Sequence, residues 1–298
     1  MKNFRYFATL FSLISFLCFL HLAKATVYGD SDDRHEVFQA PQDTQILAQS
    51  VPARILKTYL NYTGDINTTY TVAGPELRSG HCSSIRFAEQ ILGGPHVCTG
   101  FLIKEDILVT AGHCFRDPEN DCKDYAWVFD YALKGAGDRS YTSVSGKNIY
   151  SCKRVVSRKY EGFGAIDYTV IQLDRPVVGR VPLKMDLGKV LAKNLPVFII
   201  GYPSGLPQKV ADNSTIISDP GPQNFETDTD AFQGNSGSPV FDGTTGYVIG
   251  IVSSGQNDYF NNGTCKDVRV CRDGDKCIMS KMSNVKNMIG DPNLAGIL

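Results

Sequence analysis

Short apolar runs separated by turn residues dominate the chain after Cys82. The runs hold about four to seven residues, and Gly, Pro, Asp or Asn stand between them. This pattern is typical of an all-β sandwich or barrel. The predicted strands cover residues 101–103, 107–109, 126–129, 168–173, 197–201, 239–241 and 247–252. A hairpin is expected at 242–246, and only 283–289 is expected to form a helix, with Ser283 as its cap.

The first 25 residues have the layout of a secretory signal peptide. Basic residues precede an apolar run over 7–22, and Ala23-Lys24-Ala25 suits cleavage after Ala25. An uncleaved membrane anchor is the alternative, but the run is short for a spanning helix. We therefore expect a secreted or periplasmic protein with no stable membrane association after signal removal.

The segment from 26 to 80 differs from the rest of the chain in its polar composition. Its apolar residues show little sustained period, and its later part is rich in Thr and Asn. We predict an N-terminal pro-segment or linker here. A boundary between two β units is expected near 181–190.

Charge and cysteine content narrow the class of protein. Three of the 30 basic residues and none of the 31 acidic ones fall in the signal peptide, so the mature chain is about four units negative. This balance argues against a nucleic-acid partner. Eight cysteines remain outside the signal peptide and no CxxC pair occurs, which favours disulfides over a metal site. The acidic run 117–124 is expected to be a solvated loop rather than a calcium site, and no cofactor is expected.

Ser236 is the candidate nucleophile. It lies in the segment Gln233-Gly234-Asn235-Ser236-Gly237-Ser238-Pro239 between two predicted strands. Glycines on both sides allow a sharp turn that presents the hydroxyl, and they leave the amides of Gly234 and Ser236 free to point at one spot. Two converging donors can stabilise the oxyanion of an acyl-transfer transition state. A Gly/Ser-rich β-turn without catalytic role is the alternative.

A serine nucleophile needs a base, and His113 is the best candidate. It follows a predicted strand in Thr110-Ala111-Gly112-His113-Cys114, where small neighbours let the imidazole face a cleft. A structural histidine is the alternative. A disulfide between Cys98 and Cys114 would clamp the hairpin that carries His113, and such a loop is worth roughly 3 kcal/mol.

Asp167 is the candidate third residue of a catalytic triad with Ser236 and His113, because an imidazole base needs a carboxylate to fix its tautomer. It opens the apolar strand after Ile166, where a desolvated carboxylate needs a partner. Asp174 is the competitor, but its neighbour Arg175 and the proline that follows indicate a loop.

Three sequence boxes resemble those of the trypsin-like serine peptidases, in the family's order. They are TAGHC at 110–114, DYTVIQL at 167–173 and GNSGSPV at 234–240, and the likeness covers roughly 82–289. The serine box looks most like the bacterial glutamyl-endopeptidase branch. The resemblance implies a chymotrypsin-type fold of two six-stranded antiparallel β-barrels with a short C-terminal helix. The first barrel would span 81–185 and the second 186–298.

The chain departs from the family's animal members next to the serine. Asn235 stands where they have an Asp that pairs with a newly cut N-terminus, so activation is not expected to use that ion pair. The sequence does not decide whether the segment before Cys82 must be removed for activation.

Asp230 lies six residues before Ser236, where the resemblance places the base of the primary specificity pocket. A carboxylate there would select Arg or Lys before the scissile bond. A strand over about 276–282 would form the far wall, and its Lys276 would oppose this charge. Ser253, Ser254 and Gly255 would offer backbone to an extended substrate. Val252 stands where glutamate-selective members have histidine, which argues against glutamate preference.

The other cysteines divide into two sets. Cys122 and Cys152 lie in the first barrel and are expected to pair. Four more allow three connectivities: Cys82, Cys265, Cys271 and Cys277.

These observations predict a serine endopeptidase that acts as a monomer on protein or peptide substrates. The competing hypotheses are a protease-like binding protein without catalysis and an esterase with the same acyl-transfer groups. All three triad residue types are present, which favours the enzyme.

Overall fold

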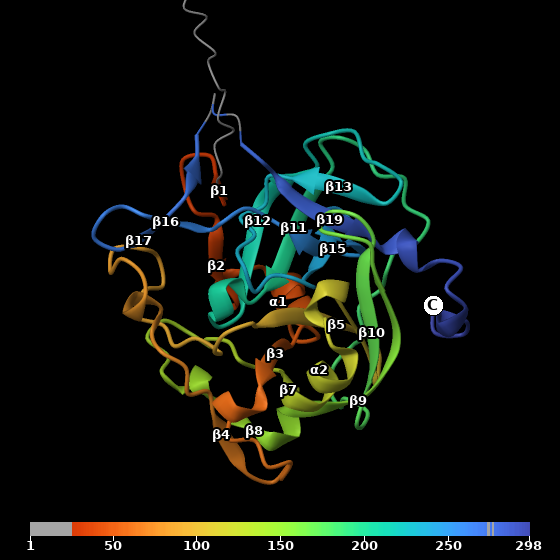
Figure 1. The fold of residues 1–298 in the computed structure, drawn as a ribbon, viewed down its shortest axis with the longest axis horizontal. Coiled ribbons are helices and arrows are strands. Elements are labelled where there is room, and N and C mark those ends of the chain that lie inside the picture. The colour runs from red at the N-terminus through yellow and green to blue at the C-terminus, as the bar shows by residue number, and fades with distance from the viewer. Residues whose placement is uncertain (1–25, 273–274, 276) are drawn as a thin grey trace, which may run out of the picture.

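The computed structural model describes residues 26–272, 275 and 277–298. The predicted signal peptide (1–25) and Lys276 lie outside the described residues. The chain forms two β units that lie side by side, and the C-terminal residues pack beside the first unit (Figure 1). None of the helices in the described ranges is long and apolar enough to cross a membrane.

The first unit is a closed antiparallel barrel of six strands in the order β10-β6-β5-β3-β7-β9. The strands are β3 (Ala53–Leu56), β5 (Cys98–Lys104), β6 (Ile107–Thr110), β7 (Tyr125–Val128), β9 (Ile149–Tyr160) and β10 (Asp167–Leu173). Nearly every residue of β6 and β10 is buried. In such a continuous apolar run, one face of the strand packs into the barrel core and the other face packs against neighbouring loops.

The second unit is a seven-stranded sheet in the order β13-β19-β15-β14-β11-β12-β2. The strands are β2 (Arg34–Glu36), β11 (Pro196–Gly201), β12 (Lys209–Thr215), β13 (Asn224–Thr227), β14 (Pro239–Asp242), β15 (Val248–Ser254) and β19 (Ser280–Asn284). The all-β prediction is confirmed, but this unit is an open sheet rather than a closed six-stranded barrel. Only one bridge, between Ile216 and Thr227, links its two sides in the described chain.

Short elements complete the fold. Three two-stranded sheets pair β1 (Val27–Tyr28) with β18 (Val270–Cys271), β4 (Thr69–Thr71) with β8 (Ser143–Ser145) and β16 (Tyr259–Asn261) with β17 (Lys266–Val268). The helices are α1 (Gln42–Ala48) and α2 (Pro118–Asp124). The acidic run 117–124 is therefore mostly helical, with the Asp117 side chain as its N-cap.

The predicted C-terminal helix over 283–289 is wrong in extent. Ser283 belongs to β19, where it pairs with both neighbouring strands, and only a 3₁₀ turn at Val285–Met288 follows. Asn284, not Ser283, caps this turn through its side chain. The pairing of β19 on both sides outweighs the helical pattern of the sequence.

The segment 26–80 is not a linker, and the first barrel does not begin at residue 81. Strand β3 closes the barrel between β5 and β7, and β2 extends the second sheet at β12. These strands have only three and four residues, too few to give a period-2 signal in the sequence. Removal of everything before Cys82 would take one strand from each unit, so the structure does not support that activation step.

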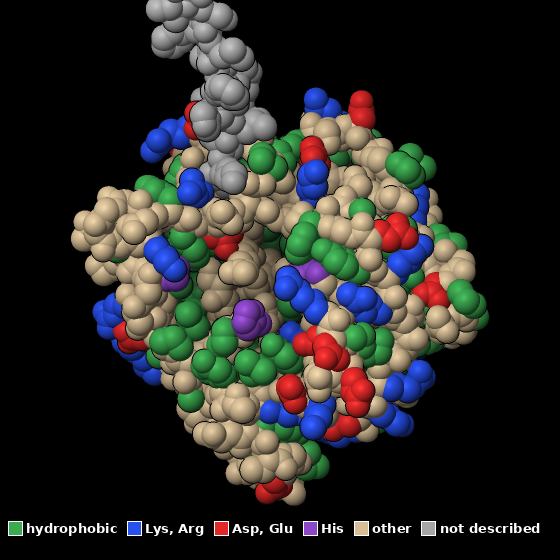
Figure 2. Space-filling model, viewed as in Figure 1, with side chains coloured by type: hydrophobic (Ala, Val, Ile, Leu, Met, Phe, Trp, Pro, Cys, Tyr) green, Lys and Arg blue, Asp and Glu red, His purple; other side chains and the backbone are tan. Residues whose placement is uncertain are grey.

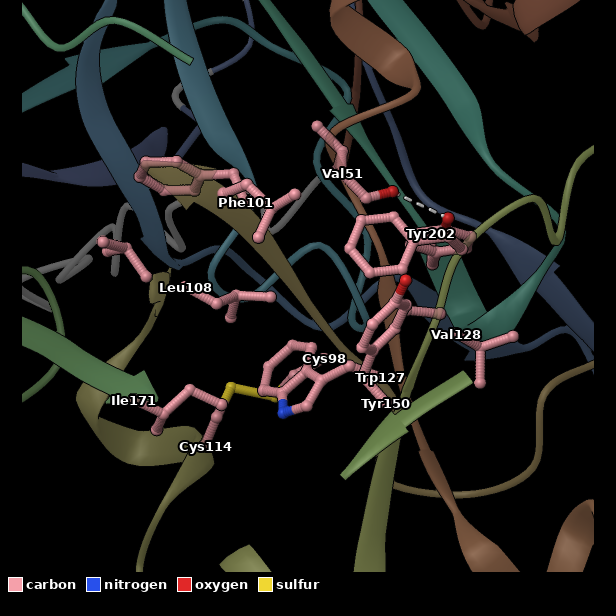
Figure 3. Close-up of a cluster of buried hydrophobic side chains, with 14 of the residues drawn as sticks. Val51, Cys98, Phe101, Leu108, Cys114, Trp127, Val128, Tyr150, Ile171 and Tyr202 are labelled. Carbon is pink, nitrogen blue, oxygen red and sulfur yellow. Dashed lines mark hydrogen bonds between the residues drawn. A yellow bond between two sulfur atoms is a disulfide. The ribbon is translucent and has the colours of Figure 1, made fainter. Parts of the chain in front are cut away.

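One aromatic side chain ties the cores of the two halves together. Tyr202 follows β11 of the second sheet, is fully buried and packs in the same cluster as Trp127 and Phe101 of the first barrel (Figure 3). Its hydroxyl donates to the carbonyl of Val51 at 2.9 Å. This hydrogen bond fixes β11 against the chain just before β3.

Four disulfides crosslink the described chain. The predicted pairs Cys98–Cys114 and Cys122–Cys152 are both present. The four remaining cysteines form Cys82–Cys265 and Cys271–Cys277, one of the three open connectivities. Cys82–Cys265 spans 183 residues and joins the connection between β4 and β5 to the second half.

Replacement of Ile55 tests whether the segment 26–80 belongs to the fold. Ile55 lies in β3 and is 0% exposed, so Ile55→Ala should lower the free energy of unfolding by about 2–4 kcal/mol through lost burial and a cavity. Ile66→Ala, at a side chain 40% exposed in the same segment, is the matched control and should change little. Urea titrations of both variants measure the difference, and equal midpoints would contradict the placement of β3.

Candidate active site

His113 is held at the edge of the first barrel by a tight turn. It follows β6 on the 3₁₀ turn Gly112–Cys114, and the Cys98–Cys114 disulfide fastens this turn to β5. A Cβ at Gly112 would lie 2.5 Å from the carbonyl of Lys159 and 3.0 Å from Oδ1 of Asp167. Only glycine allows the turn to approach the start of β10 this closely.

Asp167 is a buried carboxylate at the first position of β10, with 0% exposure. Its Oδ1 accepts the backbone N–H of His113 at 2.9 Å, and its Oδ2 lies 2.7 Å from Nδ1 of that histidine. The Ser253 hydroxyl donates to Oδ2 at 2.6 Å from the second sheet. Three donors therefore compensate the desolvation of this carboxylate.

Ser236 completes a chain of hydrogen bonds between the two halves. Its Oγ lies 2.8 Å from Nε2 of His113. Because an ionised carboxylate can only accept, Nδ1 of the neutral imidazole carries the hydrogen and Nε2 keeps its lone pair. That lone pair faces the Ser236 hydroxyl and can take its proton. Asp174, the competing carboxylate, is instead bonded to the backbone N–H of Ser151 and to Arg175.

The loop around Ser236 has glycines in the left-handed backbone region at two positions. Gly234 has φ +102° and Gly237 has φ +86°, a backbone region that favours glycine. Thr99 of β5 binds two carbonyls of this loop: its Oγ1 donates to Gly234 O at 2.9 Å and its N–H to Ser236 O at 2.8 Å. In the described part of the chain, the amides of Gly234 and Ser236 donate to no protein acceptor, so they are available to an oxyanion.

A cavity of about 1130 Å³ opens beside these groups. Both halves contribute to its wall, with His113 and Phe163 from the first and residues 231–234, 236 and 252–259 from the second. Figure 2 shows this face hollowed near its centre, with histidine and hydrophobic side chains around the hollow. Phe163 is 56% exposed and its ring lies 5.0 Å from the imidazole of His113, which gives the cavity an apolar edge.

The predicted substrate-binding residues do not all reach this cavity. Ser253, Ser254 and Gly255 line it, but Asp230 does not. Asp230 is 2% exposed, and its two carboxylate oxygens accept the backbone N–H groups of Tyr28 and Asp33 at 2.9 and 2.8 Å. Burial raises the pKa of Asp230 to about 7. The assignment of Asp230 as a substrate-binding group is therefore wrong in placement, because the segment 26–33 packs behind it.

Three functional roles were not predicted from the sequence, although Ser253 itself was expected at the substrate site. The Ser253 hydroxyl binds Asp167, Thr99 orients the Ser236 loop, and Asp258 is the acidic side chain that lines the cavity in the described chain. Asp258 is 6% exposed, and burial raises its pKa to about 6. Its position, four residues past the end of β15, carries no sequence signal that separates it from a loop aspartate.

The arrangement has the parts of a serine acyl-transfer site: a hydroxyl, an imidazole with a free lone pair facing it, a buried carboxylate and two unpaired amides. A family model described as "trypsin-like peptidase domain" matches residues 98–251. This match covers more than half of the chain, so the chain belongs to the trypsin-like peptidase family. It is a serine-type endopeptidase, and its substrates are proteins or peptides.

Solved structures share the fold at low sequence identity. The VesB protease of Vibrio cholerae has a TM-score of 0.50 and 13% identity over 86% of this chain and 64% of that chain. A Glu endopeptidase solved in complex with MPD has a TM-score of 0.48 and 16% identity, over 86% of this chain and 92% of that chain. At 13% identity the likeness to the VesB protease concerns the fold alone.

The Ser253 hydroxyl should contribute to turnover through Asp167. Ser253→Ala removes one of the donors to a fully buried carboxylate, and we expect kcat to fall about 10-fold or more with little change in KM. Ser145→Ala, at an exposed serine of β8, is the control and should leave both constants unchanged. Steady-state kinetics on a peptide substrate measure both, and an unchanged kcat would show that this hydrogen bond is dispensable.

Proposed function

We propose that this chain is a secreted endopeptidase that hydrolyses peptide bonds through an acyl-enzyme on Ser236. The observation that carries the proposal is the unbroken hydrogen-bond chain Ser236–His113–Asp167 beside a cavity. Four disulfides support an oxidising destination, together with the signal-like first 25 residues. The serine box with Asn235 supports a place in the bacterial glutamyl-endopeptidase-like branch.

The first half of the reaction forms the acyl-enzyme. Ser236 Oγ attacks the scissile carbonyl carbon while Nε2 of His113 takes the hydroxyl proton. The carbonyl oxygen becomes an oxyanion that accepts the amides of Gly234 and Ser236. Asp167 favours the imidazolium that forms. The C–N bond then breaks, and the imidazolium gives its proton to the leaving amine.

The second half releases the acid product. A water molecule takes the place of the amine, His113 removes its proton and the hydroxide attacks the acyl carbon. Collapse of this second oxyanion breaks the ester bond and returns the proton to Ser236. Ser254, the last residue of β15, and Gly255 line the cavity where an extended substrate would add a strand.

Covalent labelling tests the proposed nucleophile. The chain should react with a fluorophosphonate at one site, and Ser236→Ala should abolish both the label and peptide hydrolysis, with a loss of about 10⁴-fold or more in kcat. Ser145→Ala should label fully. Peptide mapping identifies the modified residue, and a label elsewhere or none would exclude Ser236 as nucleophile. Turnover of a peptide substrate separates an endopeptidase from an esterase, which would turn over only the matched ester.

Asp258 supports a preference for Arg or Lys before the scissile bond. It is a carboxylate in the cavity wall, and the apolar residues Ala231, Val252 and Ile278 line the same cavity. Charge-assisted hydrogen bonds of this kind contribute about 1.5–3 kcal/mol. We therefore assign to Asp258 the specificity role that the family resemblance implied for Asp230.

Two measurements test the Asp258 assignment. Asp258→Asn should lower kcat/KM for Arg and Lys substrates about 10- to 100-fold more than for a Phe substrate. Asp219→Asn, at an exposed aspartate, is the control. With a pKa raised to about 6, the Asp258 carboxyl becomes protonated below that pH, so the Arg-to-Phe ratio of kcat/KM should fall as pH drops from 7.5 to 5. A ratio independent of both changes would contradict the assignment.

A further inference from the structure

Residues 230–233 precede the amides of Gly234 and Ser236, and among the described residues the side chain of Asn235 makes no contact that would fix their position. Asn235 is buried, and its Oδ1 accepts the hydroxyl of Ser238 at 3.3 Å, a neutral contact inside the loop. Residues 230–233 lead into Gly234, so their position sets the direction of its amide. The groups that hold these residues come from the other end of the chain, from residues 26–36, which we name the N-terminal strap.

The strap is stretched between two anchored ends. At its start, β1 pairs in parallel with β18, whose Cys271 is bonded to Cys277. At its end, β2 pairs with β12, and His35 Nε2 contacts Asp212 Oδ2 at 3.0 Å. The hydrogen bond to Asp212 raises the pKa of His35. With both ends fixed in sheet, the strap presents its backbone and side chains to residues 230–233.

The first contact joins the strap backbone to Asp230. The amides of Tyr28 and Asp33 both donate to this carboxylate, one to each oxygen. Burial of a carboxyl group is costly, and two backbone donors, one to each oxygen, hold this side chain in one orientation. Asp230, the first residue of the loop, is thus hydrogen-bonded to the strap.

The second contact joins Arg34 to Phe232. The guanidinium is 1% exposed, and its carbon lies 3.5 Å from the centroid of the Phe232 ring. Asp32 of the same strap holds the guanidinium in plane through two hydrogen bonds of 2.8 and 2.5 Å. A buried stacked cation fixes the ring, and the Phe232 carbonyl in turn accepts the amide of Asn235 at 2.9 Å.

The third contact reaches Gln233 through Asp258. Thr26 Oγ1 donates to Asp258 Oδ1 at 3.2 Å, and Asp258 Oδ2 accepts the amide of Gln233 at 2.7 Å. Thr26 is 1% exposed. The strap therefore engages Asp230, Phe232 and Gln233, and the next residue is Gly234.

We propose that the N-terminal strap positions the oxyanion amides of Gly234 and Ser236, with Arg34 and Asp230 as its main positioning residues. This proposal rests on the proposed serine-peptidase function. The strap thus supports the loop before Gly234 from fixed strands. In the family's animal members, an ion pair at the position of Asn235 provides this support. It also assigns to Asp230 a role in orienting the loop rather than in choosing the substrate.

Arg34→Met tests the stacked contact in the full chain. It removes the cation from Phe232 at similar volume, and we expect kcat to fall about 10- to 100-fold with KM changed less than threefold. Affinity for a peptide aldehyde, whose serine adduct carries the oxyanion, should fall in parallel with kcat. Arg34→Lys should restore part of the loss. Arg78→Met, at an arginine 53% exposed, is the control and should keep wild-type kinetics.

Two further variants keep the test independent of the folding of Arg34→Met. Asp230→Asn should lower kcat to a similar extent on Arg, Lys and Phe substrates, whereas a specificity residue would change their ratio. Thr26→Val is isosteric and should lower kcat about threefold to tenfold with an unchanged melting temperature. Wild-type kcat and aldehyde affinity in the variants that fold would overturn the proposal, as would a loss confined to basic substrates.

Failure of the strap and failure of the enzyme give different results. If wild-type protein takes no fluorophosphonate label at Ser236, the proposed function fails. If the wild type labels and cleaves peptides while Asp230→Asn and Thr26→Val do so at the same rate, only the strap proposal fails.

Discussion

The carboxylate of Asp167 imposes the main constraint on this molecule. A fully buried negative charge is tolerated only where donors surround it, and its donors come from His113 of the same barrel and from Ser253 of the opposite sheet. The two halves must therefore dock in one register. Correct docking also sets the imidazole between the carboxylate and Ser236, so folding and assembly of the site are one event.

The hydroxyl side of the site is held by several weaker contacts. Thr99 binds two carbonyls of the Ser236 loop from the first barrel, and Tyr202 anchors the neighbouring strand through Val51. Glycines 234 and 237 adopt backbone angles that side chains would strain. Each contact is neutral or local, so precision here comes from their number rather than from one strong pair.

The sequence predicts correctly those strands and site residues whose signal lies in their immediate sequence neighbours. All seven predicted strands fall within or overlap observed strands, since apolar runs such as that of β10 report burial directly. Strand β9 was missed because its middle is exposed and charged, and β3 because four residues give no period. The residues of the three boxes were found because small neighbours and a nearby cysteine mark them. Asp230 was misplaced and Asp258 overlooked, because a carboxylate's partners depend on which distant segment packs against it.

The Cys82–Cys265 disulfide closes a covalent ring of chain that contains His113, Asp167 and Ser236. The connection between β10 and β11 exposes Val178, Val181 and Val190, each more than two thirds accessible, and such stretches are where a peptidase meeting copies of itself would cut. A single nick there opens the ring but releases neither piece. The His113 and Ser236 fragments stay tethered, and the buried contacts between halves can hold them in place. The ring thus keeps both halves of the site in one covalent molecule after a single cut in this connection.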